Sequence, residues 1–228
     1  YRHNNKWLDI VSRKEIVPLK NGRDTTITIR KTHHGPIISD IHPLLKDKKY
    51  VVSMCWVGNQ ITNEISALSK FSLVKNWKDF SSVAKEFSVP GQNIIYADTA
   101  GNIGWRAAAL IPIRKEGSSL LPRPGWDPDY DWKGFISFEE MPYLYNPNKG
   151  YIATANNKIV DDTFPYYISN QWAEPSRIER IEEYIQSKEK MSVNDMKLLQ
   201  NDMLSSFARE VTPNIIKHFP NNLKGNKK

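Results

Sequence analysis

The sequence has 228 residues, enough for one domain with a sizeable hydrophobic core. It contains 32 basic and 25 acidic residues, a formal net charge of +7. No apolar run is long enough to span a membrane, and the single cysteine, Cys55, excludes an internal disulfide and a cysteine-based metal cage. Without an initiator methionine or a signal peptide, we expect a processed chain or part of a longer one.

The basic excess permits binding to nucleic acid, an anionic membrane or an acidic substrate. Lysine and glutamate are interspersed along the predicted helices, however, and only the tail with Lys224, Lys227 and Lys228 is densely basic. No nucleic-acid-binding signature is present. We therefore expect solvated surface charge and no nucleic-acid partner. An anionic-polymer binder is the weakest functional hypothesis, and it would require binding that falls steeply with salt.

Two strands are expected in the first quarter of the chain. Residues 25–30 read T-T-I-T-I-R, alternate from Thr26 onward and follow a turn at Gly22. Residues 50–57 are rich in β-branched and aromatic residues, which predicts a strand and, within it, a buried and inert Cys55 thiol.

Adjacent histidines, His33 and His34, precede Gly35 and Pro36. Such a pair could bind a metal or transfer protons. No third ligand stands at a recognisable spacing, so we predict no metal and expect His34 to orient a turn.

Two helices and a hairpin are expected next. Thr62 can cap a helix that runs to about residue 73, and Asn76 with Asp79 can cap a second. One face of this second helix carries Trp77, Phe80, Ala84 and Phe87, and Pro90-Gly91 ends the segment. Residues 93–97 and 103–109 predict a hairpin around a turn that begins at Asp98. Asp98 could be an acid or a ligand, but its place in the turn favours hydrogen bonds to the backbone.

Residues 117–131 form a predicted loop rich in proline, glycine and aspartate. Asp127, Asp129 and Asp131 alternate there, as in some calcium loops. Pro128 interrupts them and no glutamate follows at the required distance, so we predict no calcium site in this loop.

The last third is predicted to be helical. Residues 175–186 carry an apolar stripe of Ile178, Ile181 and Ile185. Ser192 and Asp195 predict the cap of a further helix that carries Met196, Leu199, Met203 and Phe207. Thr212-Pro213 should break or restart this helix, and a frayed tail is expected from Pro220.

The most informative stretch is G-Y-I-A-T-A-N-N at residues 150–157. Its alternation predicts a strand that ends at Asn156, whose side-chain amide could donate a hydrogen bond to a developing oxyanion. Arg177 opens the following helix and could return to the same place. Alternatively, Asn156 binds a neighbouring loop and Arg177 is a surface cation, although a positive charge at a helix start opposes the macrodipole.

This stretch, followed by W-x-x-x-x-R-I-x-x-I at residues 172–181, resembles the β chain of penicillin amidases, which are N-terminal-nucleophile hydrolases. Further motifs occur in the same order as in that family. They are Y-x-H-N-x-K-W at residues 1–7, T-x-H-G at 32–35, K-N-W at 75–77, Y-A-D-x-x-G-N-I-G at 96–104, and P-x-P-G followed by D-W-K-G at 122–134.

The resemblance implies an α+β fold, the four-layered α/β/β/α sandwich with antiparallel sheets. It implies that residues 1–228 are one domain, the central and C-terminal part of a β subunit. Tyr1 would match a position inside that subunit, so the N-terminal nucleophile and the first strands would be missing and this piece alone would be inactive. The partners would be an α subunit and the rest of the β chain, and the location would be periplasmic or secreted.

The implied activity is hydrolysis of a linear amide C–N bond in an acylated small molecule. By resemblance, Asn156 matches the oxyanion-hole asparagine, and Arg177 matches the arginine that orients it. Leu68 and Gln92 match acyl-pocket positions, although Gln92 departs from the aromatic-acyl pattern and both could be ordinary residues. No cofactor is expected. The family often binds a structural calcium, but its aspartate ligand upstream of Trp172 would fall near Tyr166, so we expect no metal here. The alternative is a non-catalytic relative that binds acyl compounds.

Overall fold

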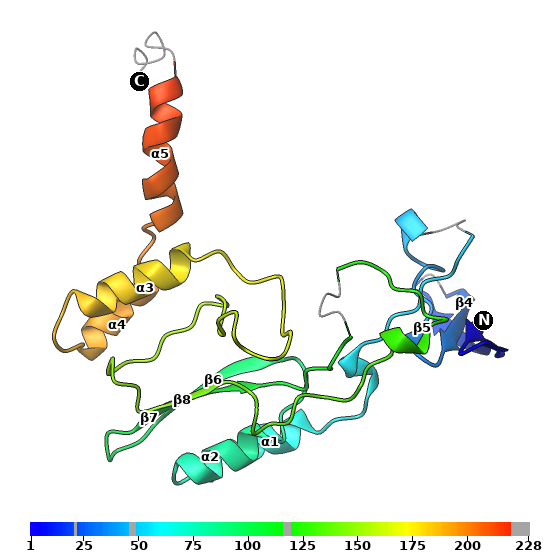
Figure 1. The fold of residues 1–228 in the computed structure, drawn as a ribbon, viewed down its shortest axis with the longest axis horizontal. Coiled ribbons are helices and arrows are strands. Elements are labelled where there is room, and N and C mark those ends of the chain that lie inside the picture. The colour runs from blue at the N-terminus through cyan, green and yellow to red at the C-terminus, as the bar shows by residue number, and fades with distance from the viewer. Residues whose placement is uncertain (21, 46–48, 116–119, 220–228) are drawn as a thin grey trace. The chain divides into compact units, whose positions relative to one another are not determined.

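The computed structural model describes residues 1–20, 22–45, 49–115 and 120–219 (Figure 1). Contacts divide the chain into two compact units. The first comprises Tyr1–Asn146 and Thr163–Asn170, and the second comprises Pro147–Asp162 and Gln171–Lys228.

The first unit begins with a small antiparallel pair, β1 (Arg2–His3) and β2 (Lys6–Trp7), and a three-stranded antiparallel sheet. That sheet consists of β3 (Val11–Pro18), β4 (Asp24–Thr32) and β5 (Gly35–Pro36), in the order β3-β4-β5. The register pairs Val11 with Lys31 and Pro18 with Asp24. The strand predicted at residues 25–30 is therefore confirmed.

The strand predicted at residues 50–57 is wrong. Ser53 forms only an isolated antiparallel bridge with Ile37, flanked by a 2.8 Å bond from the Met54 N–H to the Pro36 carbonyl. The bridge partner Ile37 lies just beyond β5, which has only two residues, so no extended ladder forms, and a 3₁₀ turn (Val57–Asn59) follows. The predicted buried thiol is also wrong, because Cys55 is exposed.

Two short helices follow, each capped by an asparagine. α1 (Glu64–Phe71) begins at Asn63, whose side chain accepts a bond from the Ser66 N–H, and not at the expected Thr62. α2 (Trp77–Ala84) begins at Asn76, which accepts from the Asp79 N–H at 2.9 Å, as predicted. Although α1 begins later than predicted, its residue Ala67 is fully buried.

The predicted hairpin is confirmed as β6 (Gln92–Ala97) and β7 (Ile103–Ala108), to which β8 (Tyr143–Tyr145) adds a third antiparallel strand (Figure 1). Asp98 has the predicted backbone role. It accepts bonds from the Ala100 and Asn102 N–H groups, and a 2.7 Å bond from the Tyr96 hydroxyl. These bonds, the tyrosine's foremost, lower the pKa of Asp98 to about 2.

A hydrophobic core joins α1, α2 and the β6-β7-β8 sheet. Its buried centre is Ala67, Ala84, Phe87 and Ala108. Beside it, the Trp77 ring stacks on Phe80 and Tyr145 with ring centroids 5.4 and 4.8 Å away. Gly104 makes room for that indole, because a Cβ at this position would lie 2.2 Å from the ring.

The aspartates of the predicted loop have separate partners. Asp127 caps a 3₁₀ turn (Pro128–Tyr130), Asp129 pairs with Lys115, and Asp131 accepts a bond from His34. Tyr166, where the family's calcium ligand would fall, donates a 2.6 Å bond to Glu140.

The second unit contains α3 (Ser176–Gln186), α4 (Val193–Gln200) and α5 (Ser206–His218). The Ser192–Asp195 capping box is confirmed. Because α4 ends at Gln200, Met203 lies between the helices and Phe207 belongs to α5, contrary to the expectation of one helix. Pro213 lies inside α5 and does not break it. The tail predicted from Pro220 lies outside the described residues.

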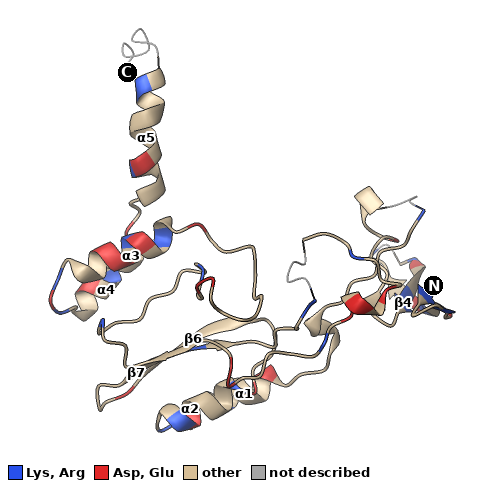
Figure 2. Cartoon of the chain, in the orientation of Figure 1, with Lys and Arg blue, Asp and Glu red and all other residues tan. Residues whose placement is uncertain are grey.

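Basic and acidic residues are interspersed along α3 and α4 (Figure 2). Residues of α3 pair with residues outside these two helices, Arg180 with Asp202 at 2.6 Å and Glu183 with Arg209 of α5 at 3.1 Å. The prediction of mixed surface charge on these helices is confirmed. Among the described residues, no helix has the length and apolar character that crossing a membrane requires.

Candidate functional site

The strand predicted at residues 150–157 is not formed, because no described strand pairs with it and the chain bends at Ala155 and Asn156. Asn156 has φ 60°, in the left-handed region, which asparagine tolerates better than most residues. Its carbonyl accepts a 2.9 Å bond from the Ala173 N–H. Asn157 secures the bend, since its Oδ1 accepts a 3.0 Å bond from the buried Ala155 N–H.

Arg177, in the first turn of α3, contacts this bend directly. Its Nη2 donates to the Ala155 carbonyl at 2.6 Å and to Asn156 Oδ1 at 3.2 Å. A guanidinium group can only donate, so this contact identifies which end of the Asn156 amide is the oxygen. The opposite end, the Nδ2 donor, has no hydrogen-bond partner among the described residues, and the residue is exposed. The arrangement presents a fixed and available N–H donor.

The start of α3 is itself well anchored. The Glu174 carboxylate accepts a 2.9 Å bond from the Ser176 N–H, and Ser206 donates a 2.8 Å bond to the Ser176 carbonyl. Hydrogen bonds from Ser176 lower the pKa of Glu174. A carboxylate at the helix start offsets the unfavourable position of the Arg177 charge.

The two other predicted site residues lie in the first unit. Leu68 is on α1 and is 58% exposed. Gln92 is the exposed first residue of β6, opposite Ala108 in the register. Ala67 precedes Leu68 in the chain, and Ala108 lies opposite Gln92 in the register; both alanines are buried in the core. Leu68 and Gln92 are themselves exposed and are not core residues. Asn156 and Arg177 belong to the second unit.

Asn157 is a contributor that sequence reasoning missed. The two adjacent amides were visible in the sequence, but only the first was given a role. The capacity of asparagine to bond a backbone N–H two residues away is the signal that could have identified the second.

A second polar cluster lies in the first unit, where His3, His33 and His34 surround Asp131. Their Nε2 atoms lie 3.5, 3.6 and 2.7 Å from the carboxylate oxygens. The His33 ring centroid is 4.0 Å from that of His3 and 3.7 Å from that of His34. The His34 side chain reaches a distant loop at Asp131, whereas the sequence predicts only that it orients a turn. Asp131 could not be predicted as a partner, since it follows the histidines by nearly 100 residues.

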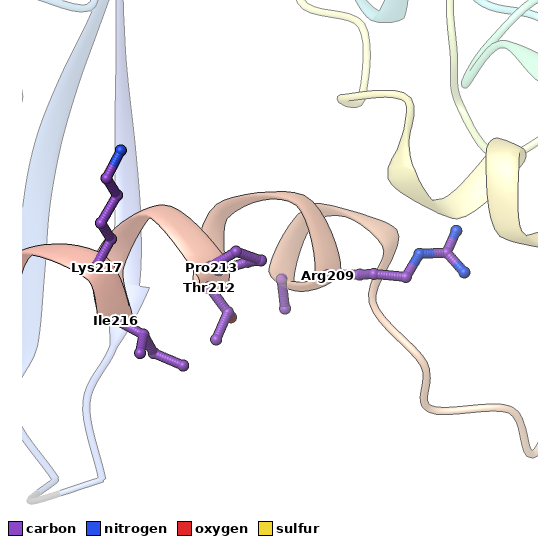
Figure 3. Close-up of a pocket in the computed structure, with 6 residues that line it drawn as sticks. Arg209, Thr212, Pro213, Ile216 and Lys217 are labelled. Atoms are coloured by element: carbon purple, nitrogen blue, oxygen red, sulfur yellow. The ribbon is translucent and has the colours of Figure 1, made fainter. Parts of the chain in front are cut away.

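A shallow, open pocket runs along α5 and is lined by six residues of this one helix: Ala208, Arg209, Thr212, Pro213, Ile216 and Lys217 (Figure 3). Arg209 and Lys217 extend in different directions from the helix (Figure 3). Among the described residues, no second element closes the pocket and no convergent set of polar groups lines it, so these residues do not form a substrate site there.

The sequence matches the family model for penicillin amidase over residues 1–228. The chain belongs to the penicillin amidase family. It is 30% identical over 211 residues to an acyl-homoserine lactone acylase, QuiP, of Pseudomonas fluorescens, and 31% identical over 200 residues to penicillin G acylase of Escherichia coli. These matches cover 92% and 85% of this chain, respectively. The chain spans only about a quarter of these relatives, 26% and 23% of their lengths.

The structure is similar to that of a thermostable penicillin G acylase from Alcaligenes faecalis, with a TM-score of 0.73 and 26% sequence identity. The match covers 97% of this chain and 40% of that one. This similarity supports one part of the expected fold, namely antiparallel sheets together with helices, as in a known acylase.

Proposed function

We propose that this chain is part of an amidohydrolase that cleaves the linear amide C–N bond of an acylated small molecule. One observation carries the proposal. Arg177 binds the Asn156 Oδ1 at 3.2 Å, which leaves the Nδ2 donor available at a bend that three further hydrogen bonds secure. A preorganised donor of this kind can stabilise the oxyanion of a tetrahedral intermediate.

In the proposed reaction, the N-terminal residue of the whole β subunit supplies a serine, cysteine or threonine nucleophile. Its side-chain oxygen or sulfur attacks the amide carbonyl, and the α-amine takes the proton, because an α-amine titrates at about pH 8. The carbonyl oxygen becomes an oxyanion that accepts a hydrogen bond from Asn156 Nδ2. Collapse of the intermediate breaks the C–N bond, and the proton passes to the leaving amine. Water then releases the acyl group. This piece alone would be inactive without the nucleophile.

Arg177 is proposed as a positioning residue that acts through Asn156. In the whole protein, Arg177→Lys should lower kcat about tenfold and leave KM nearly unchanged, because the lysine Nζ ends one bond short of the Nη2 that donates to both the Ala155 carbonyl and Asn156 Oδ1. Arg209→Lys is the matched control, since it removes a guanidinium that pairs with Glu183 on an exposed surface. Steady-state kinetics of both variants test the role. A kcat loss of the same size in both would contradict it.

We also propose that the two units contribute to a four-layered α/β/β/α sandwich that the rest of the protein completes. The exposed apolar side chains of β3 and β4 support this. Val11, Val17 and Ile27, which share one face of the β3–β4 pair, are 56%, 37% and 45% exposed. A monomeric surface seldom displays such a group without a covering partner. The partners would be an α subunit and the remainder of the β chain, and residues 1–228 would then be part of one domain.

Leu68 and Gln92 are proposed to contact the acyl group. If so, Gln92→Phe in the whole protein should raise the preference for phenylacetyl over aliphatic amides about tenfold, since an aromatic side chain replaces a polar one beside the acyl group. The measurement is the ratio of kcat/KM values across phenylacetyl, glutaryl and long-chain acyl amides. An unchanged ratio would remove Gln92 from the pocket.

Hydrolysis of this amide panel by the wild-type whole protein is the direct test of the proposed function. The N-terminal residue of its β chain should be determined by mass spectrometry in the same preparation. Turnover together with a serine, cysteine or threonine terminus supports an acylase. A terminus without a nucleophile and no turnover would favour the non-catalytic relative that binds acyl compounds.

A further inference from the structure

Three residues of the first unit bring metal-binding atoms together. They are His3, His33 and Asp131, here called the His3–His33–Asp131 cluster, and one ligand atom from each lies within 4.8 Å of the others. Their side chains are 19%, 30% and 30% exposed. The cluster is therefore neither sealed from solvent nor fully solvated, and an ion could reach it.

The distances within the cluster fit shared coordination better than direct hydrogen bonding. His3 Nε2 lies 3.5 Å from Asp131 Oδ2, and His33 Nε2 lies 3.6 Å from Asp131 Oδ1. Both exceed the usual hydrogen-bond range of about 2.7–3.2 Å. Ligand atoms bound at about 2.1 Å to a tetrahedral zinc ion lie about 3.4 Å from one another. The two separations are near that edge length but end on different oxygens of Asp131. With one oxygen taken as the ligand, the three ligand atoms lie within 4.8 Å of one another, so binding one ion requires the side chains to move closer together.

The surrounding hydrogen bonds also suit coordination. His3 Nδ1 lies 3.4 Å from the Gly125 carbonyl, which favours a proton on Nδ1 and leaves the Nε2 lone pair for a metal. His34 Nε2 lies 2.7 Å from Asp131 Oδ1 and can donate to it. This bond orients the carboxylate in the way that outer hydrogen bonds orient metal ligands in proteins.

The backbone brings the ligands from three separate segments. His3 belongs to β1, His33 lies in the turn between β4 and β5, and Asp131 follows the 3₁₀ turn at Pro128–Tyr130. The Asn4 N–H donates a 3.1 Å bond to the Trp126 carbonyl, and the His33 N–H donates a 3.1 Å bond to the Tyr1 hydroxyl. These bonds hold the segments together, so binding an ion requires only a small adjustment of side chains.

We propose that His3, His33 and Asp131 bind a divalent transition-metal ion, for which Zn²⁺ is the probe. Two imidazoles and one carboxylate suit zinc-like ions, whereas calcium prefers an all-oxygen set. Three protein ligands leave the fourth position of a tetrahedral ion to water. The ion would link β1, the β4–β5 turn and the Asp131 loop. This inference does not depend on the proposed amidase activity.

Zinc uptake by the whole protein tests the site. Protein without a polyhistidine tag is stripped with a chelator, dialysed against limiting Zn²⁺, and its bound metal is counted by mass spectrometry. Wild type should bind one more equivalent than His33→Asn or Asp131→Asn. His42→Asn is the matched control, because His42 is an exposed histidine of the same unit outside the cluster. It should retain the full count.

A second measurement guards against variants that fail to fold. His34→Phe keeps an aromatic ring beside His33 but removes the bond to Asp131, and it should weaken zinc affinity about 10- to 100-fold without changing the stoichiometry. Co²⁺ added to stripped wild type should give the visible absorption of a tetrahedral nitrogen and oxygen site. Equal zinc counts in wild type and His33→Asn, with both proteins folded by circular dichroism, would overturn the proposal. So would an affinity unchanged by His34→Phe.

Discussion

Replacing Asn156 with alanine in the whole protein should lower kcat about 100- to 1,000-fold, the usual cost of removing one oxyanion-hole donor. The reason is geometric. Arg177 occupies the amide oxygen, so the Nδ2 group is the end that can face an oxyanion. KM should change little, because the bond forms mainly in the transition state. Steady-state kinetics on a phenylacetyl or long-chain acyl amide measure the effect.

The backbone at this bend needs a separate control, because alanine tolerates φ 60° less well than asparagine. Asn156→Asp keeps the size and the left-handed tolerance but replaces the N–H donor with an anion, so kcat should fall at least as far. Asn146→Ala removes another left-handed asparagine, at φ 47°, that bonds the Ile103 N–H at 2.9 Å. It should lower the melting temperature and leave kcat unchanged. A kcat within twofold of wild type for Asn156→Asp would refute the oxyanion role.

The elements predicted correctly are those whose signals are local. The Asn76 cap, the Ser192–Asp195 capping box and the Asp98 turn each depend on side chains that bond a backbone group within four residues. Such bonds are encoded within a short window of sequence. They can be identified from spacing alone.

The two strands that were predicted but do not form depend on distant partners. Residues 50–57 and 150–157 both have strand-like composition, but neither meets a described strand long enough to form a ladder with it. β-propensity reflects suitability for a pleated and half-buried surface, and a strand forms only where a partner is present. Pro213 shows the opposite case, because α5 continues through a residue that usually ends a helix.

The candidate site residues also differ in how far the sequence can predict their contacts. Asn156 and Arg177 were predicted together from resemblance to a family, and they lie in contact at 3.2 Å. Asp131 could not be assigned to His33 and His34 from spacing, because the contact closes a loop of nearly 100 residues. Sequence spacing identifies metal ligands only when they are close together in the chain.

The core around α2 should dominate the stability of the first unit. Phe80 is 4% exposed, and its ring centroid lies 5.2 to 5.6 Å from those of Trp77, Phe71 and Tyr96. Phe80→Ala removes these contacts and leaves a cavity, so the local free energy of unfolding should fall by about 3–5 kcal/mol. Hydrogen exchange of the backbone amides of α2 and β6 in the whole protein measures this loss. Lys78→Ala, at an exposed position of the same helix, should change it by less than about 0.5 kcal/mol. Similar exchange rates in the two variants would mean that the aromatic cluster contributes little and that other parts of the protein hold α2 in place.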